Sequence, residues 1–266
     1  MYQLSFGLTR RPFDRDIDCE RLFNTSQLDE LHTRLGFCVE QRGVGLLTGE
    51  PGTGKSTALR RLHHGLHPDR VRAVYLHDTA VGVADLYRQL AHELCIEPAF
   101  SRALTLRRIQ GEIVRLGTER HLTVLLVLDE AHRLRPDVLA ELPVLTSFDW
   151  DKTPRLAVVL AGQTGLRARL RLAELEPLAQ RVTTRFNLRT LDRDGIKGYV
   201  EHRLRHAGLD RPLFTEPAYE ALHSASGGVM RKLDQAAHHA LLAAAAAKSR
   251  LVEAEHVARA AEEMRP

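Results

Sequence analysis

The sequence predicts an α/β fold, in which a parallel five-stranded sheet is flanked by helices and followed by a small all-helical domain. Three observations lead to this prediction. Up to Leu191, continuous apolar runs of strand length alternate with amphipathic helical stretches, a pattern typical of a parallel sheet covered on both faces. A glycine-rich loop separates the first such strand from the helix that follows it. After Leu191, every periodic stretch is helical.

We expect three segments along the chain. Residues 1–40 form an N-terminal arm and a first helix, residues 41–191 form the α/β domain, and residues 192–266 form the helical domain. Asp192 is the expected N-cap of the first helix in that last segment, and Gly208 is expected to end it. The five predicted strands are GVGLLTG (43–49), RAVYLHD (72–78), LTVLLVLDEAH (122–132), RLAVVLAGQ (155–163) and RFNLRTL (185–191).

The composition is that of an ordinary soluble globular protein. Of the 266 residues, 44% are apolar and 27% are charged. No apolar run approaches the roughly 18 residues that a membrane span needs, and the N-terminus has no signal-peptide core, so we expect no membrane contact and a cytoplasmic location. Three scattered cysteines and isolated histidine pairs argue against a disulfide framework or a zinc site. A net charge of +4 permits nucleic-acid binding without establishing it.

The glycine-rich loop GEPGTGKST is predicted to bind the phosphates of a nucleotide. It fits the pattern GxxxxGK[ST] and lies between a strand and a helix, which is the context that the motif requires. Glycines let backbone N–H groups approach phosphates, and the helix N-terminus adds the positive end of its dipole. Lys55 is expected to reach the β- and γ-phosphates, and Ser56 to ligate Mg²⁺. The candidate nucleotide-binding residues are Gly49, Glu50, Pro51, Gly52, Thr53, Gly54, Lys55, Ser56 and Thr57.

A second motif, LLVLDEAH, supplies two carboxylates at the end of an apolar strand. Asp129 is expected to orient the Mg²⁺ ion, and Glu130 to polarise the attacking water as general base. The letters DEAH also occur in helicases, but those need two tandem nucleotide-binding domains, and this chain has one phosphate loop. The sequence therefore predicts a P-loop NTPase that uses ATP and Mg²⁺.

The order of these features resembles the AAA+ ATPases, which carry a helical lid after the fifth strand. Within them the chain is most similar to the ExeA/GspA-like group, near the origin-recognition-type branch. The resemblance covers nearly the whole chain, and the motifs outside the phosphate loop carry the narrower assignment. Those motifs are FGLTRRPF (6–13), AVVLAGQTGLRARL (157–170), LAQRVTTRF (178–186), YVEHRLRHAG (199–208) and SGGVMRKLDQ (226–235).

The resemblance implies further roles at the site. Gln163 stands where a sensor 1 residue contacts the γ-phosphate, or else it is simply a polar strand end. Arg181 resembles the arginine finger that enters a neighbouring subunit's site, Arg185 is the alternative, and a surface ion pair is the ordinary role of either. Arg231 resembles the sensor 2 arginine of the lid, although Met230 replaces the usual proline before it. A finger acting on a neighbour implies a ring or filament of the chain.

Near the N-terminus, Pro12 and Phe13 either border the adenine or pack in the core. The two alternatives are open from the sequence.

The resemblance also suggests a biological role. Secretion ATPases of this group carry a membrane span and a peptidoglycan-binding region after the core, whereas this chain ends at Pro266. The compact plan is similar to transposition helper ATPases of the TniB and TnsC kind, which polymerise on duplex DNA and recruit a transposase. We therefore expect double-stranded DNA, bound without strong sequence specificity, and a transposase as partners. A secretion-assembly ATPase and an ATP-dependent protein-interaction switch without DNA are the alternatives.

Two arginine clusters are candidates for phosphate contact. The predicted helix 101–117 carries Arg108 and Arg115 with Glu112 between them, and residues 167, 169 and 171 are all arginine. Contacts to DNA phosphates would make binding strongly salt-dependent. The alternative for each cluster is a solvated helix face with internal ion pairs.

Overall fold

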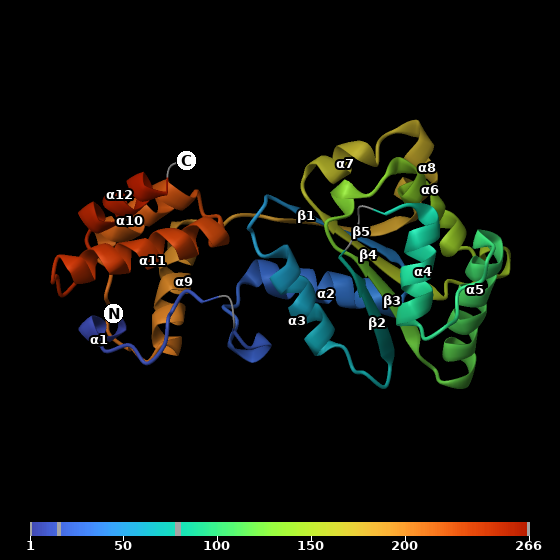
Figure 1. The fold of residues 1–266 in the computed structure, drawn as a ribbon, viewed down its shortest axis with the longest axis horizontal. Helices are drawn as coiled ribbons and strands as arrows, with labels where there is room; N and C mark the ends of the chain where they lie inside the picture. Colours follow the sequence, from blue (N-terminus) through green and yellow to red (C-terminus); the bar gives the residue numbers. More distant parts are fainter. Residues whose placement is uncertain (1, 15–16, 78–80, 265–266) are drawn as a thin grey trace. The chain divides into compact units, whose positions relative to one another are not determined.

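A computed structural model describes residues 2–14, 17–77 and 81–264. Its core is one five-stranded sheet in the order β2-β3-β4-β1-β5, with every neighbouring pair parallel (Figure 1). This confirms the predicted sheet. The strands are β1 (Val44–Gly49), β2 (Val71–Leu76), β3 (Thr123–Leu128), β4 (Leu156–Gly162) and β5 (Val182–Leu188).

The fifth strand was predicted three residues too late. We expected it over 185–191, but Val182 already pairs with Val44 of β1 and the strand ends at Leu188. Beyond it, the backbone N–H of Leu191 donates to the carbonyl oxygen of Gly228 at 2.9 Å instead of continuing the ladder. The end of the predicted second strand, residue 78, lies outside the described residues.

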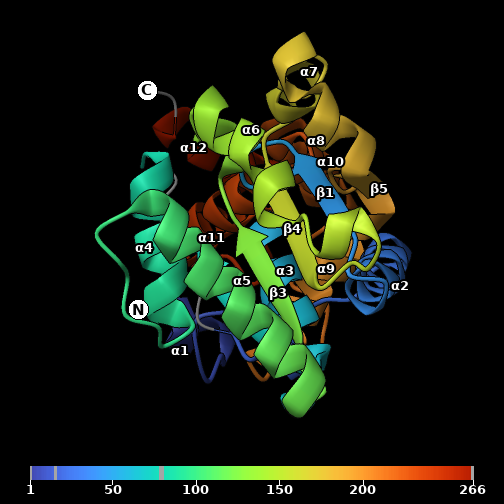
Figure 2. The ribbon, with the colours of Figure 1, turned by 90° about the vertical axis from the view of Figure 1, so that its right-hand side faces the viewer.

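Helices cover both faces of the sheet, which explains why the inner strands β1, β3 and β4 are buried almost throughout, without alternation. One face packs against α2 (Ser26–Glu40) and α3 (Lys55–Gly65), and the other packs against α4 (Val83–Glu93), α5 (Arg102–Glu119) and α6 (Pro136–Leu145). Figures 1 and 2 show α4 and α5 on one side of the sheet and α2 on the other. Alternate β3 residues enter the two cores: Val124, Leu126 and Leu128 face α4–α6, and Leu125 and Val127 face α2 and α3.

Short helical elements occupy the connections around β3, β4 and β5. They are η2 (Ala131–Arg133) and η3 (Asp149–Asp151), followed between β4 and β5 by α7 (Gly165–Arg169), η4 (Ala173–Leu175) and α8 (Glu176–Arg181). Leu166 and Leu178 attach α7 and α8 to the core on the α4–α6 side of the sheet.

The C-terminal residues form the predicted helices α9 (Arg193–His206), α10 (Glu216–Ser226), α11 (Met230–Ala246) and α12 (Ala254–Glu263). The Asp192 side chain accepts a hydrogen bond from the backbone N–H of Gly195 at 2.8 Å, so the predicted N-cap is confirmed. Gly208, with φ of +87°, follows the end of α9 as expected.

The chain divides into two compact units. One comprises Gln27–Gly49 and Lys55–Leu188, and the other joins the residues up to Ser26, the loop residues Glu50–Gly54 and the chain from Arg189 onward. In the second unit, the short helices α1 (Tyr2–Phe6) and η1 (Cys19–Arg21) accompany the C-terminal helices. None of the helices among the described residues is long and apolar enough to cross a membrane.

The N-terminal arm is part of the core of the helical unit. Phe13 is buried in the same apolar cluster as α9, α10 and α11. The guanidinium of Arg203, itself buried, donates to the backbone carbonyl oxygens of Pro12 and Asp14. Of the two roles considered for Phe13, core packing is therefore what the structure describes.

Gly228 is expected to tolerate no side chain. Its φ is +74°, and a Cβ atom there would lie 2.0 Å from the carbonyl oxygen of Leu191. Gly228→Ala must therefore displace the chain at Leu191, and we expect it to lower the free energy of unfolding by at least about 2 kcal/mol, the strain of a left-handed residue plus a lost hydrogen bond. Urea denaturation followed by circular dichroism measures this.

The neighbouring Gly227 provides the control. Its φ is +58°, but a Cβ there meets nothing within 4 Å. Gly227→Ala should cost only the left-handed strain of roughly 1 kcal/mol. Equal destabilisation by the two substitutions would contradict the clash at Leu191.

Candidate nucleotide-binding site

The loop between β1 and α3 has the backbone of a phosphate-binding loop. Gly52 and Gly54 have φ of +85° and +97°, values that residues with a Cβ rarely adopt. Lys55 opens α3 with 6% of its surface exposed, and its Nζ donates to the carbonyl oxygen of Gly49 at 3.0 Å. The ammonium group is thus held at the start of α3, where the helix N-terminus also favours an anion.

Asp129 follows β3 and is almost completely buried, with 2% exposed. Its Oδ2 accepts hydrogen bonds from the Ser56 hydroxyl at 2.8 Å and the Tyr75 hydroxyl at 2.7 Å, and its Oδ1 accepts from the backbone N–H of Glu130 at 2.8 Å. The fold therefore brings together the two residues predicted to ligate Mg²⁺. A carboxylate and a hydroxyl oxygen are donors that suit this ion.

Glu130 adopts a left-handed conformation, with φ of 52° and ψ of 30°. For a residue with a side chain this costs on the order of 1–3 kcal/mol, and such strain concentrates at functional sites. Its Oε2 lies 3.6 Å from Nε2 of His132, and the side chain is 42% exposed. The carboxylate is therefore available to solvent at the edge of the sheet where the strands end.

Gln163 lies directly after β4, which separates β1 from β3 in the sheet. Its backbone N–H donates to Nδ1 of His132 at 3.4 Å. His132 therefore links the strand end that carries Gln163 to the carboxylate of Glu130. His132 was not predicted as a site residue, since the letters DEAH were considered only as a helicase signature, which was rejected.

The two candidate arginine fingers have different surroundings. Arg181, at the end of α8, donates to Oδ2 of Asp151 at 2.8 Å and to the Ser147 hydroxyl at 3.1 Å. The hydrogen bond that Asp151 accepts from Arg181, and then its hydrogen bond with Ser147, lower the pKa of the Asp151 carboxyl. Arg185 is exposed on β5 and donates to the backbone carbonyl oxygen of Ala179 at 2.9 Å. Within one copy of the chain, Arg181 thus forms the ion pair that we considered as its ordinary role.

Arg231 is the second residue of α11, which begins at Met230 although the usual proline is absent. The backbone N–H of Arg231 donates to the carbonyl oxygen of Gly52 at 3.1 Å, and a Cβ on Gly52 would lie 2.9 Å from the Cβ of Arg231. The Arg231 side chain itself is exposed. The predicted sensor 2 residue therefore contacts the phosphate-binding loop.

Tyr75 was not predicted as a site residue. It lies on β2, in register with Val127 of β3, so its hydroxyl reaches the carboxylate that follows β3. Burial, and then the hydrogen bond to Asp129, raise the pKa of Tyr75. The sequence signal for Tyr75 was a side chain with a polar tip near the end of a predicted strand. The sequence does not show that this strand pairs with the strand that precedes Asp129.

Tyr75→Phe is expected to weaken Mg²⁺ binding about 10- to 100-fold, since hydrogen bonds that orient a ligating carboxylate typically have effects of this size. The measurement is a Mg²⁺ titration of fluorescent ATP binding. Tyr87→Phe is the matched control, because its hydroxyl also donates to a carboxylate, that of Glu141, at 2.7 Å. A Mg²⁺ midpoint that Tyr75→Phe leaves unchanged would show that Asp129 needs no such orientation.

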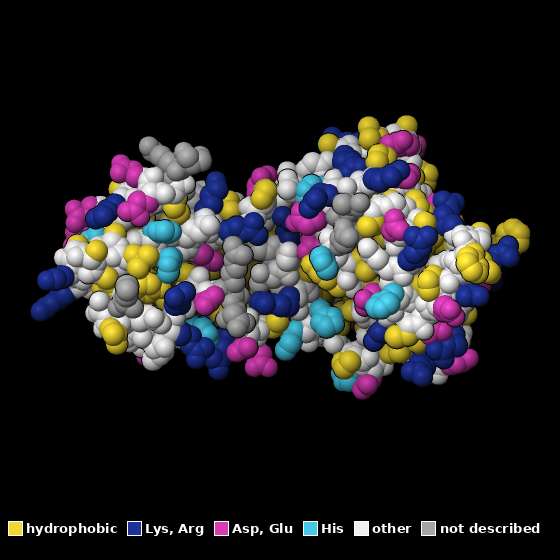
Figure 3. Space-filling model, in the orientation of Figure 1, with side chains coloured by type: hydrophobic (Ala, Val, Ile, Leu, Met, Phe, Trp, Pro, Cys, Tyr) yellow, Lys and Arg dark blue, Asp and Glu magenta, His cyan; other side chains and the backbone are white. Residues whose placement is uncertain are grey.

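Most of the arginines considered for DNA contact have partners within the protein. Arg115 pairs with Glu112 at 2.6 Å and Glu119 at 3.3 Å, and Arg108 donates to the carbonyl oxygen of Glu97. Arg169 donates to the backbone carbonyl oxygens of His132 and Leu134. On the face seen in Figure 3, basic and acidic side chains are interspersed. The helix α5 therefore fits the alternative of internal ion pairs.

Comparison with known proteins agrees with this geometry. Residues 39–170 match the family described as AAA domain. The chain is 34% identical over 247 residues to general secretion pathway protein A of Aeromonas hydrophila, in an alignment that covers 92% of this chain and 45% of that protein. The chain thus spans less than half the length of this curated relative.

Similar folds occur in three groups of solved structures. Cdc6p from Pyrobaculum aerophilum has a TM-score of 0.72 at 22% identity, covering 95% of this chain and 70% of that one. The Aeropyrum pernix ORC1 protein in complex with DNA has a TM-score of 0.67 at 16% identity, covering 95% and 68%. The Thermotoga maritima RuvB branch migration motor has a TM-score of 0.57 at 16% identity, covering 95% and 73%.

At identities of 16–22%, the solved structures show that the fold is shared. The similarity in sequence is to general secretion pathway protein A. The phosphate-binding loop, the buried Asp129 and the strand order are together consistent with a P-loop nucleotide-binding fold. The chain therefore carries an AAA domain over residues 39–170, is similar in sequence to general secretion pathway protein A, and shares its fold with Cdc6p and the ORC1 protein.

Proposed function

We propose that this protein hydrolyses ATP with Mg²⁺, and does so as an oligomer. The observation that carries the proposal is the hydrogen bond of 2.8 Å between Ser56 and Asp129. It joins the end of the phosphate-binding loop to the end of β3, and so assembles the two expected Mg²⁺ ligands. When bound, Mg²⁺ neutralises charge on the phosphate oxygens.

Each residue of the site has a role in this proposal. The Lys55 ammonium binds the β- and γ-phosphates, and the Glu130 carboxylate accepts a proton from the attacking water. Gln163 orients that water or the γ-phosphate, and Arg231 binds the nucleotide from the lid.

The catalytic arginine comes from a second copy of the chain. Arg181 would have to exchange Asp151 and Ser147 for a phosphate, whereas Arg185 would give up a single carbonyl oxygen. The need for an arginine from a neighbour makes the isolated chain a poor ATPase.

We further propose that the oligomer assembles on double-stranded DNA and recruits a transposase. The support is the pair of exposed arginines Arg167 and Arg171, which have no acidic partner among the described residues and are available to contact DNA phosphates. Such contacts to phosphates carry no sequence information, so the binding would be non-specific.

The test is binding of fluorescent, random-sequence duplex DNA at moderate salt, with ATP·Mg²⁺, with ADP·Mg²⁺ or without nucleotide. Cooperative binding that requires ATP supports a DNA-loaded assembly. Absence of binding in all three conditions refutes the role on DNA and leaves the ATPase proposal to be judged by phosphate release.

A secretion-assembly ATPase is the second candidate, and the 34% identity to general secretion pathway protein A favours it. In that case ATP turnover should respond to a cell-envelope partner and not to DNA. Fractionation of cells that express the tagged protein separates the two candidates: recovery with the membrane fraction favours the secretion role. A DNA-independent monomer that binds ATP and turns it over slowly would favour a protein-interaction switch.

A further inference from the structure

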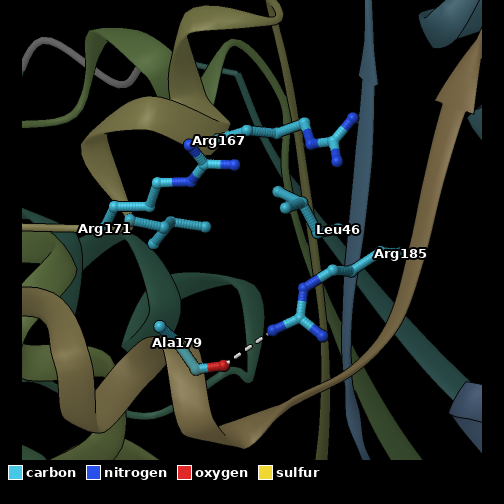
Figure 4. A pocket seen from close by; sticks show the side chains of 6 residues that line it. Leu46, Arg167, Arg171, Ala179 and Arg185 are labelled. Atoms are coloured by element: carbon cyan, nitrogen blue, oxygen red, sulfur yellow. Dashed lines mark hydrogen bonds between the residues drawn. The ribbon is translucent and has the colours of Figure 1, made fainter.

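Three arginines surround a pocket on the α4–α6 side of the sheet. None of the residues that line it belongs to the phosphate-binding loop. Arg167 lies on α7, Arg171 follows that helix, and Arg185 lies on β5 (Figure 4). The pocket is also lined by the apolar residues Leu46, Leu170 and Ala179.

The sheet brings the third arginine to this pocket. Leu46 of β1 and Arg185 of β5 are register partners in the parallel ladder, so their side chains stand side by side on the same face. Figure 4 shows the three guanidinium groups around one opening, with Leu46 between them. Residues that are far apart in the sequence thus form a single concave site.

No carboxylate among the described residues pairs with the arginines of this pocket. Neither Arg167 nor Arg171 forms a side-chain hydrogen bond or ion pair with any described residue, and Arg185 has only the carbonyl oxygen of Ala179. Arg155 and Arg181 on neighbouring segments are each paired with a carboxylate, Asp149 and Asp151. Three guanidinium groups that share a pocket repel one another, and a bound anion relieves that repulsion.

We propose that this pocket binds a phosphate group. A guanidinium presents a planar fork of donors that matches a phosphate in a bidentate manner. A carboxylate has two oxygens and is satisfied by one such fork, whereas a phosphate offers oxygens in several directions and can engage all three arginines. The phosphate comes either from a DNA backbone or from a free oligophosphate.

The two sources are distinguished by two probes. Binding of inorganic triphosphate tests the pocket alone, and it is measured in the Lys55→Ala protein so that the phosphate-binding loop does not contribute. Binding of duplex DNA rests on the proposed function. A failure of the DNA role therefore leaves the triphosphate measurement as an independent test of the pocket.

The variant is Arg167→Gln/Arg171→Gln, and the matched control is Arg107→Gln/Arg120→Gln. The control removes the same charge from exposed positions on and next to α5. We expect the pocket variant, and not the control, to lose at least about tenfold in triphosphate affinity, the effect of removing charge-assisted hydrogen bonds. With duplex DNA, the slope of log K against log salt should become shallower by about 1.8, or 0.9 for each lost phosphate contact.

The outcomes separate cleanly. Loss of triphosphate binding with an unchanged DNA slope supports a pocket for free phosphates. Loss of triphosphate binding together with a shallower salt slope of DNA binding supports DNA contact at this pocket. The proposal is wrong if the pocket variant and the control weaken the binding of triphosphate and of DNA equally. It is also wrong if neither variant changes the binding of either probe.

Discussion

Lys55→Ala is expected to lower ATP turnover at least about 100-fold, the effect of removing one preorganised group that binds developing charge. Lys55 is 6% exposed, and its ammonium is fixed by the carbonyl oxygen of Gly49 at the first turn of α3. The loop GEPGTGKST contains no second lysine that could replace it. Phosphate release in the presence of excess ATP·Mg²⁺ measures the loss.

The fold should survive this substitution. Alanine is a good helix former, and the change removes a buried charge without opening the apolar core. Lys152→Ala, at an exposed position in the same unit, is the control for loss of a positive charge. If Lys55→Ala turned over ATP as fast as the unchanged protein, the assignment of the phosphate-binding loop would be wrong.

Glu130→Gln is expected to lower turnover about 10²- to 10⁴-fold while leaving ATP binding intact, since it removes a general base and keeps the size of the side chain. The left-handed backbone of Glu130 and the hydrogen bond from its N–H to Asp129 do not depend on the side chain. The Mg²⁺ ligands therefore keep their arrangement, and the variant should accumulate in the ATP-bound state.

This accumulation has a second consequence if the protein assembles on DNA. Glu130→Gln should dissociate from duplex DNA much more slowly than the unchanged protein when ATP is present, because hydrolysis no longer releases it. Competition with excess unlabelled DNA measures the rate. Dissociation as fast as that of the unchanged protein would separate hydrolysis from DNA release, and normal turnover would exclude Glu130 as the base.

The features that could be predicted from the sequence are those in which one short segment carries the whole signal. The strand, loop and helix around Lys55 are contiguous, and the glycines at 52 and 54 have the positive φ that the motif requires. The N-cap at Asp192 is likewise a local hydrogen bond, to Gly195. Boundaries were less certain, as at β5, where a long-range pairing between Val182 and Val44 begins the strand.

Other features depend on which distant segments meet. Nothing in the sequence distinguishes Arg167, Arg169 and Arg171 from one another. In the structure, Arg169 donates to backbone carbonyl oxygens, whereas the other two line a pocket with Arg185. Helical spacing separates residue 169 from residue 167 by about half a turn of α7, and residue 171 lies beyond the end of that helix. The carbonyl groups that receive it come from residues 132 and 134, in a different connection of the chain.

The α/β class, the phosphate-binding loop and the carboxylate after the third strand could thus be predicted from the amino-acid sequence, because local hydrogen bonding and strand-length apolar runs encode them. The three-dimensional fold was needed to learn that β4 lies between β1 and β3, that Ser56 and Tyr75 both bond to Asp129, and that Arg181 pairs with Asp151. Those contacts join residues whose proximity is set by the packing of helices on both faces of the sheet, and no short stretch of sequence contains that information.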